Sequence, residues 1–133
     1  MLAACAAGTP GEAPPPRAQD LAAEGWRVAT SKEGIYELAW RPAGGVAVPR
    51  NRDFDVEIAL FRDGEPLTGA GIRPRGWMPE HGHGLARSPQ VVEEGAGRYR
   101  VQSMLLHMRG HWEVLFDVVH SGVGDIVAFE VDL

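Results

Sequence analysis

The residues from 53 to 61 alternate in polarity, and this alternation constrains the fold more than any other feature of the sequence. Apolar side chains occupy the even positions, and acidic side chains occupy three of the odd ones, Asp53, Asp55 and Glu57. Because successive side chains of a strand point to opposite faces, the pattern predicts a half-buried β-strand. The segment from Trp112 to Val119 repeats the pattern.

Further short apolar segments lie between turns rich in glycine and proline. The dipeptide Asp63-Gly64 is typical of a hairpin turn, and Gly95-Ala96-Gly97 marks a second turn. No segment shows an apolar repeat at helical spacing, so we expect an all-β, antiparallel sandwich of about seven strands. The expected strands cover residues 35–41, 53–61, 66–75, 91–92, 98–106, 112–119 and 126–131.

The first part of the chain has the composition of a tail. Residues 6–23 are mostly alanine, glycine, proline and charged residues, which bury too little apolar surface to offset the entropy of ordering. We therefore expect a disordered N-terminal segment over residues 1–23 and a sandwich domain over residues 24–133.

The N-terminal residues Leu2-Ala3-Ala4-Cys5 resemble the lipobox at which bacterial lipoproteins are cleaved and lipidated. The charged start and apolar stretch of a full signal peptide do not precede them here. We expect lipidation at Cys5 and an exported protein of the periplasm or cell envelope, held at the membrane only through its lipid. The alternative is a chance cysteine in an alanine-rich tail.

Methionine and histidine are concentrated in two short segments. Residues 77–84 and 104–111 together hold three of the four methionines and four of the five histidines. A hydrophobic core uses methionine as scattered filler and does not require histidine beside it. Thioether sulfur and imidazole nitrogen together suit a soft or borderline metal, copper above all.

We therefore predict a copper site on loops at one end of the sandwich, able to hold Cu(I), Cu(II) or both. Zinc is the weaker candidate, because it would use the histidines and ignore the methionines. Taken alone, Met104 is equally explained as a core residue, and each histidine has a structural alternative. The candidate metal ligands are Met78, His81, His83, Met104, His107, Met108 and His111.

Several classes of function are disfavoured by the composition. The formal net charge is −5, and no basic stripe is present to neutralise nucleic-acid phosphates. The sequence contains no run of about 18 apolar residues, which is the length that a membrane-spanning helix needs. No nucleophile–base pair and no phosphate-binding glycine loop stands out, so we do not expect an enzyme.

The two histidine-rich segments also resemble a known family. The stretches Trp77-Met78-Pro79-Glu80-His81-Gly82-His83-Gly84 and His107-Met108-Arg109-Gly110-His111-Trp112-Glu113 are similar to the YtkA-like/FixH-like family of exported bacterial domains. The resemblance implies an immunoglobulin-like sandwich and a link to copper handling. Carried over residue by residue, it makes Met78, His81, His83, His107 and Met108 the metal-facing positions.

Two functions from different classes follow from these observations. The first is a copper carrier, chaperone or scavenger outside the cytoplasm, which exchanges its ion with a copper-delivery or copper-receiving envelope protein. The second is a metal-free protein-interaction module of the cell envelope, in which the methionines and histidines serve the fold.

Overall fold

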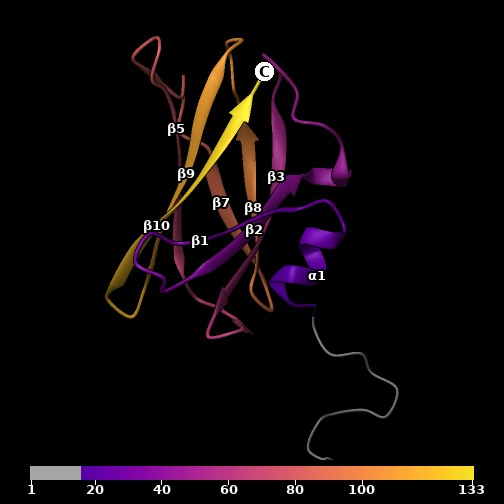
Figure 1. Ribbon diagram of the computed structural model, residues 1–133, viewed down its shortest axis with the longest axis vertical. Helices are drawn as coiled ribbons and strands as arrows, with labels where there is room; N and C mark the ends of the chain where they lie inside the picture. The colour runs from indigo at the N-terminus through magenta and orange to yellow at the C-terminus, as the bar shows by residue number, and fades with distance from the viewer. Residues whose placement is uncertain (1–15) are drawn as a thin grey trace, which may run out of the picture.

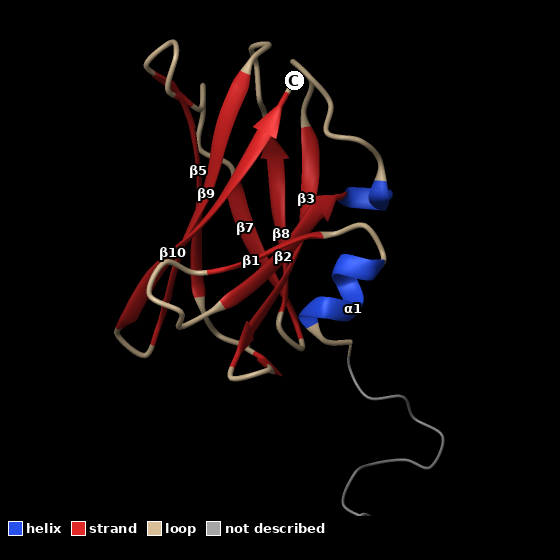
Figure 2. Ribbon diagram, in the orientation of Figure 1, coloured by secondary structure: helices blue, strands red, loops and turns tan. Residues whose placement is uncertain are grey.

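The computed structural model describes residues 16–133, which form two antiparallel β-sheets packed face to face (Figure 1). One short helix lies outside the sandwich (Figure 2). In chain order the elements are α1 (Ala18–Ala23), β1 (Arg27–Thr30), β2 (Glu37–Pro42), the 3-10 turn η2 (Ala43–Gly45), β3 (Phe54–Arg62), β4 (Glu65–Pro66), β5 (Gly71–Met78), β6 (His83–Gly84), β7 (Gln90–Gly95), β8 (Arg98–Met104), β9 (His111–His120) and β10 (Val123–Asp132).

The order of the strands is that of an immunoglobulin-type sandwich. One sheet runs β1-β2-β3-β8-β7, with β4 paired to β3, and the other runs β10-β9-β5-β6. The runs β2-β3-β8-β7 and β10-β9-β5 match the ABED and GFC sheets of the constant-type fold. The predicted all-β sandwich of about seven strands is therefore confirmed, with β1, β4 and β6 as additional short strands.

The core lies between the two sheets and is centred on aromatic side chains. Trp40 on β2 packs against Phe116 on β9 and Phe129 on β10, with ring centroids 6.1 and 5.9 Å apart. Trp40 thereby joins the two sheets through one buried side chain. The even positions of β3 face this core, as the alternation of the sequence predicts.

Helix α1 covers the outer face of the first sheet. Leu21 of the helix is buried against Trp26, Ala59 and Phe61, in a cluster separate from the main core. The sequence prediction placed this stretch in the linker, whereas the structure packs it on the sheet. The reason is that the outer face of β3 is not fully polar, so Ala59 and Phe61 need an apolar cover.

Two further expectations concern the membrane and the N-terminus. No helix within residues 16–133 is both long and apolar enough to cross a membrane. The lipobox-like segment with Cys5, and the first part of the predicted tail, lie outside the described residues.

Candidate metal centre

The hairpin between β5 and β6 brings three of the predicted ligands together. The backbone N–H groups of His81 and Gly82 both donate to the carbonyl oxygen of Met78, at 3.2 and 2.8 Å. This tight turn places His83 directly opposite Met78 in the strand register. Gly82 has a φ of 65°, which a glycine adopts without strain. The imidazoles of His81 and His83 lie with their ring centroids 6.3 Å apart.

His107 approaches this hairpin from the segment between β8 and β9. Its ring centroid lies 6.3 Å from that of His83 and 5.6 Å from that of Trp112. Its Nδ1 is buried and has no hydrogen-bond partner among the described residues. Burying a polar atom without a hydrogen-bond partner costs folding free energy. An imidazole nitrogen without such a partner can give its lone pair to a metal ion.

Trp112 fixes the loop that carries His107. Its indole N–H donates to the carbonyl oxygen of Met108 at 2.9 Å, and its side chain is fully buried. This hydrogen bond satisfies a buried indole N–H and holds the loop against the sheet. This anchoring role of Trp112 depends on a tertiary contact that the sequence pattern does not reveal.

Gly110 allows the two segments to approach each other. A Cβ atom at this position would lie 2.9 Å from the methyl carbon of Met78 and 4.0 Å from Nε2 of His81. Its φ of +132° is also one that side chains rarely adopt. The Met78 thioether, the His81 ring and the backbone at Gly110 are therefore neighbours, and any side chain at Gly110 would displace one of them.

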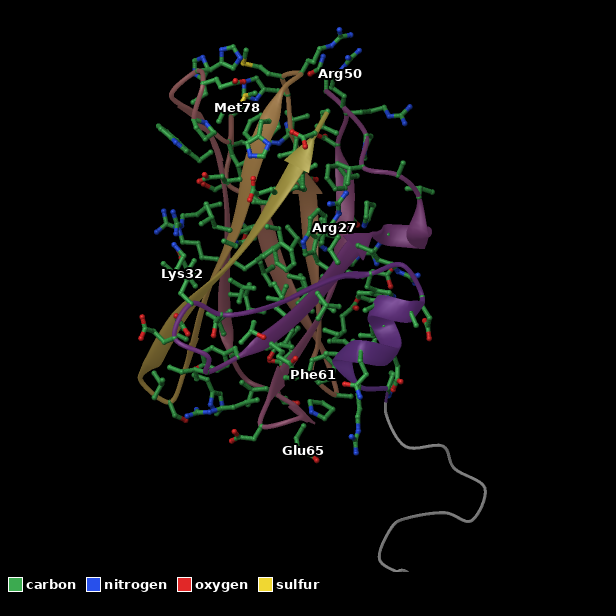
Figure 3. All side chains as sticks on the ribbon, in the orientation of Figure 1. Arg27, Lys32, Arg50, Phe61, Glu65 and Met78 are labelled. Carbon is green, nitrogen blue, oxygen red and sulfur yellow. The ribbon has the colours of Figure 1, made fainter. Side chains whose placement is uncertain are left out.

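The three methionines differ in their surroundings. Met78 and Met104 are 0% and 1% exposed and belong to the main core, whereas Met108 is only partly buried against it. Met78 packs in the core, and its methyl carbon also lies beside the backbone of Gly110, in the segment that carries His107. Met104 pairs with Phe54 in the strand register, and core packing accounts for it. Figure 3 shows Met78 at the end of the sandwich where the hairpin turns.

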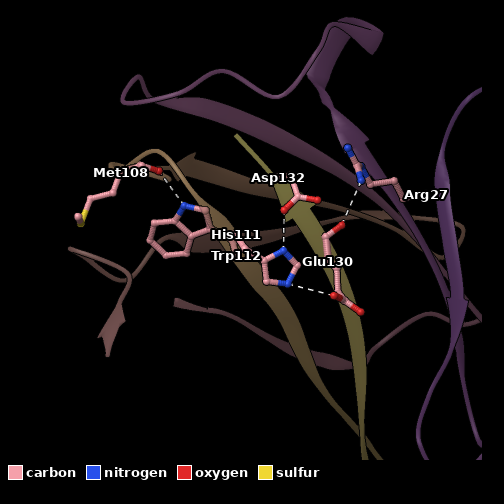
Figure 4. Close-up of polar contacts among 6 residues, drawn as sticks. All are labelled: Arg27, Met108, His111, Trp112, Glu130 and Asp132. Carbon is pink, nitrogen blue, oxygen red and sulfur yellow. Dashed lines mark hydrogen bonds and ion pairs between the residues drawn. The ribbon is translucent and has the colours of Figure 1, made fainter. Parts of the chain in front are cut away.

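His111 is separate from the other histidines. Its Nδ1 lies 2.7 Å from a carboxylate oxygen of Asp132, and its Nε2 lies 3.0 Å from one of Glu130. Both ring nitrogens therefore already have partners on β10, and Figure 4 shows the Met108 side chain extending away from this group. The structure thus brings together Met78, His81, His83 and His107 but does not bring His111 to them.

The carboxylates raise the pKa of His111 above its ordinary value. The hydrogen bond to Asp132 is the main cause, desolvation opposes it, and the charges of Asp132 and Glu130 add to it. Because the pKa of His111 is raised in the folded state, its contacts with the two carboxylates stabilise the fold fully below the unfolded pKa of about 6.5. This stabilisation disappears as the pH rises through the folded pKa.

We therefore expect His111→Gln to lower the free energy of unfolding near pH 6 and to change it little near pH 9. Urea unfolding of the variant and the parent chain at the two pH values measures the difference. An equal effect at both pH values would show that the ion pair is not the source.

The described residues contain no group of three histidine, cysteine, aspartate or glutamate side chains that converge on one point. Metal binding at this end of the sandwich therefore requires the methionine sulfur as well as imidazole nitrogens. A thioether beside two or three imidazoles fits soft Cu(I), which is satisfied by few ligands.

The comparisons with known proteins agree with the fold. The YtkA-like family model matches residues 30–116. The crystal structure of a DUF4426 family protein from Pseudomonas aeruginosa PAO1 superposes with a TM-score of 0.57 at 14% identity, covering 83% of this chain and 95% of that one. No curated protein matches this chain. Because the family model spans more than half of the sequence, the chain belongs to the YtkA-like family.

Proposed function

We propose that this chain is an exported copper-binding protein that carries, hands over or scavenges Cu(I) or Cu(II). Met78, His81, His83 and His107 hold the ion, and the more exposed thioether of Met108 is a second sulfur donor. The observation that carries the proposal is a row of neighbours where the β5–β6 hairpin meets residues 107–110: the ring of His83 lies 6.3 Å from those of His81 and His107, and the Met78 methyl carbon lies beside Gly110.

The chemistry of these donors favours copper over zinc. Zinc prefers four ligands of nitrogen, oxygen or thiolate in a tetrahedron, and residues 16–133 bring no three histidine, cysteine or carboxylate side chains to one point. Thioethers are soft ligands that select Cu(I), while imidazoles also suit Cu(II). A mixed set of this kind binds both oxidation states without a closed cage, which suits transfer to a partner.

The location and the partner belong to the same proposal. The lipobox-like residues before Cys5 support lipidation and a place in the periplasm or cell envelope. The partner is an envelope protein that delivers copper to this site or receives it. The first experiment does not depend on either, because it uses the chain and the metal alone.

A competition titration tests the proposal. The purified chain is titrated with Cu(I) and with Cu(II), each against a chelator of known affinity, and with Zn(II) as the control metal. We expect one tightly bound copper per chain and weak zinc. Failure to bind any metal would contradict the proposal and favour the metal-free interaction module, which the burial of Met78 and Met104 in the core supports.

Gly110→Ala should weaken copper binding without removing a ligand. The new Cβ would lie 2.9 Å from the Met78 methyl carbon, so the thioether must shift. We expect the affinity for Cu(I) to fall by about tenfold to hundredfold, the range for residues that position metal ligands. The strained φ would also cost about 1–3 kcal/mol of stability.

The same titration, together with thermal unfolding, measures both effects of this variant. Gly122→Ala is the matched control, because Gly122 also has a positive φ but has open space around its Cβ position. A Gly110→Ala variant that is destabilised like the control but binds copper normally would contradict the proposed geometry.

A further inference from the structure

A cation-lined hollow lies on the outer face of the second sheet, separate from the core side on which Met78 is buried. It has a volume of about 440 Å³. Apolar side chains of Leu115 and Ile126 and the exposed ring of Trp77, at 43%, contribute to its lining. Its charged residues are Lys32, Arg73, Arg75, Arg87 and a single carboxylate, Glu113.

The positive charge of this hollow is only partly neutralised. Arg75 forms a two-pronged ion pair with Asp117 at 2.7 Å, and Arg87 pairs with Asp53. Lys32 and Arg73 form no ion pair with any residue in the range 16–133 and are exposed. In a chain of net charge −5, a hollow lined by four cations and one carboxylate is a local reversal of sign.

A second hollow of about 520 Å³ continues the first along β9. The two share Arg73 and Ile126, and the second is lined by Ile72, Val118, Val119 and two glycines, together with Asp117, whose carboxylate is paired with Arg75. Val119 is 50% exposed. Asp125 also borders this hollow, but its carboxylate accepts a hydrogen bond from the backbone N–H of Glu33 at 2.8 Å.

Together the two hollows form a track that follows β9 from Glu113 to Val119, with β5 on one side and β10 on the other (Figure 1). At about 3.4 Å per residue, this length matches an extended segment of about six residues. A small anion would fill only the cationic half and leave the apolar half uncovered.

We propose that this track binds an extended segment of a partner protein that is acidic at one end and aliphatic at the other. The acidic side chains lie over Lys32 and Arg73, and the aliphatic ones cover Val119, which lines only the second hollow. Charge complementarity supplies orientation and apolar burial supplies affinity. Nucleic acid fits less well, because Trp77 is the only aromatic ring in the lining on which a base could stack.

The test uses the metal-free full chain, so its result does not depend on copper binding. The probes are six-residue peptides of three glutamates and three aliphatic residues, synthesised in both orders, and the same peptides with lysine in place of glutamate. Binding is followed by backbone amide chemical shifts. We expect the glutamate peptide in one order to shift amides of β5, β9 and β10 along the track, with an affinity that falls as salt is added.

Two charge reversals and a matched control complete the test. Lys32→Glu and Arg73→Glu should each weaken binding by about tenfold, whereas Arg50→Glu, which makes the same charge change on a distant loop (Figure 3), should change it by less than about twofold.

Several results of the peptide test would overturn the proposal. They are equal loss in all three variants, equal binding of the lysine peptides, or no peptide binding at all. Shifts of the same amides by glutarate or by a thymidine oligonucleotide at lower concentration than the peptide would also overturn it.

Discussion

Replacing His83 and His107 together with alanine is expected to abolish stoichiometric copper binding. His83 lies between His81 and His107, with centroid distances of 6.3 Å to each, so it is the centre of the imidazole group. His107 supplies the only imidazole of this group that comes from residues 104–111, because His111 is paired with carboxylates on β10. Without both, only His81 and the thioethers remain, and the affinity in the competition titration should fall by at least about a hundredfold.

The chain offers a matched control for this variant. His111→Ala combined with His120→Ala also removes two imidazoles, but His111 is paired with carboxylates on β10 and His120 lies at the opposite end of β9. We expect this control to bind copper as the parent chain does. Comparable loss in both double variants would show that the bound copper is not held where the hairpin meets the 107–110 loop.

Trp40→Ala should have the largest effect on stability. The indole is 1% exposed and packs against Phe116 and Phe129 of the opposite sheet, so its removal leaves a cavity between the layers. Large aromatic residues replaced by alanine in a core cost about 3–5 kcal/mol. Because domains of this size have only about 5–15 kcal/mol of stability, the variant should be close to unfolding at ambient temperature.

Urea unfolding of Trp40→Ala measures this loss, and Trp77→Ala is the control with the same change of side chain. Trp77 is 43% exposed and lies on the outer face of β5, so its removal should cost less than about 1 kcal/mol. Equal destabilisation by the two substitutions would contradict the assignment of Trp40 as the residue that joins the sheets.

The sequence predicts the sandwich well because its strands alternate clearly. The even positions of β3 and β9 face the core in the structure, and the Asp63-Gly64 turn follows β3 as expected. Helix α1 was missed because its six residues carry too short a pattern for helical periodicity. The apolar residues Ala59 and Phe61 on the supposedly polar face of β3 are the feature that points to a cover.

The candidate site was predicted in part. The hairpin residues come together because they are neighbours in sequence, and His107 joins them because β9 pairs with β5, with Trp77 opposite Glu113. His111 could not be separated from the others by sequence, because its partners on β10 are about twenty residues away. The close approach at Gly110 likewise depends on tertiary contacts that spacing does not reveal.

The measurement that tests the account most directly is X-ray absorption spectroscopy of the chain loaded with one equivalent of Cu(I). A spectrum with both imidazole nitrogen and thioether sulfur around the copper is the predicted result. The sulfur should disappear in Met78→Leu/Met108→Leu, which nearly conserves volume, and persist in Met104→Leu. A parent spectrum with nitrogen and oxygen alone, or sulfur retained in the Met78 and Met108 double variant, would contradict a copper site built from this methionine–histidine group.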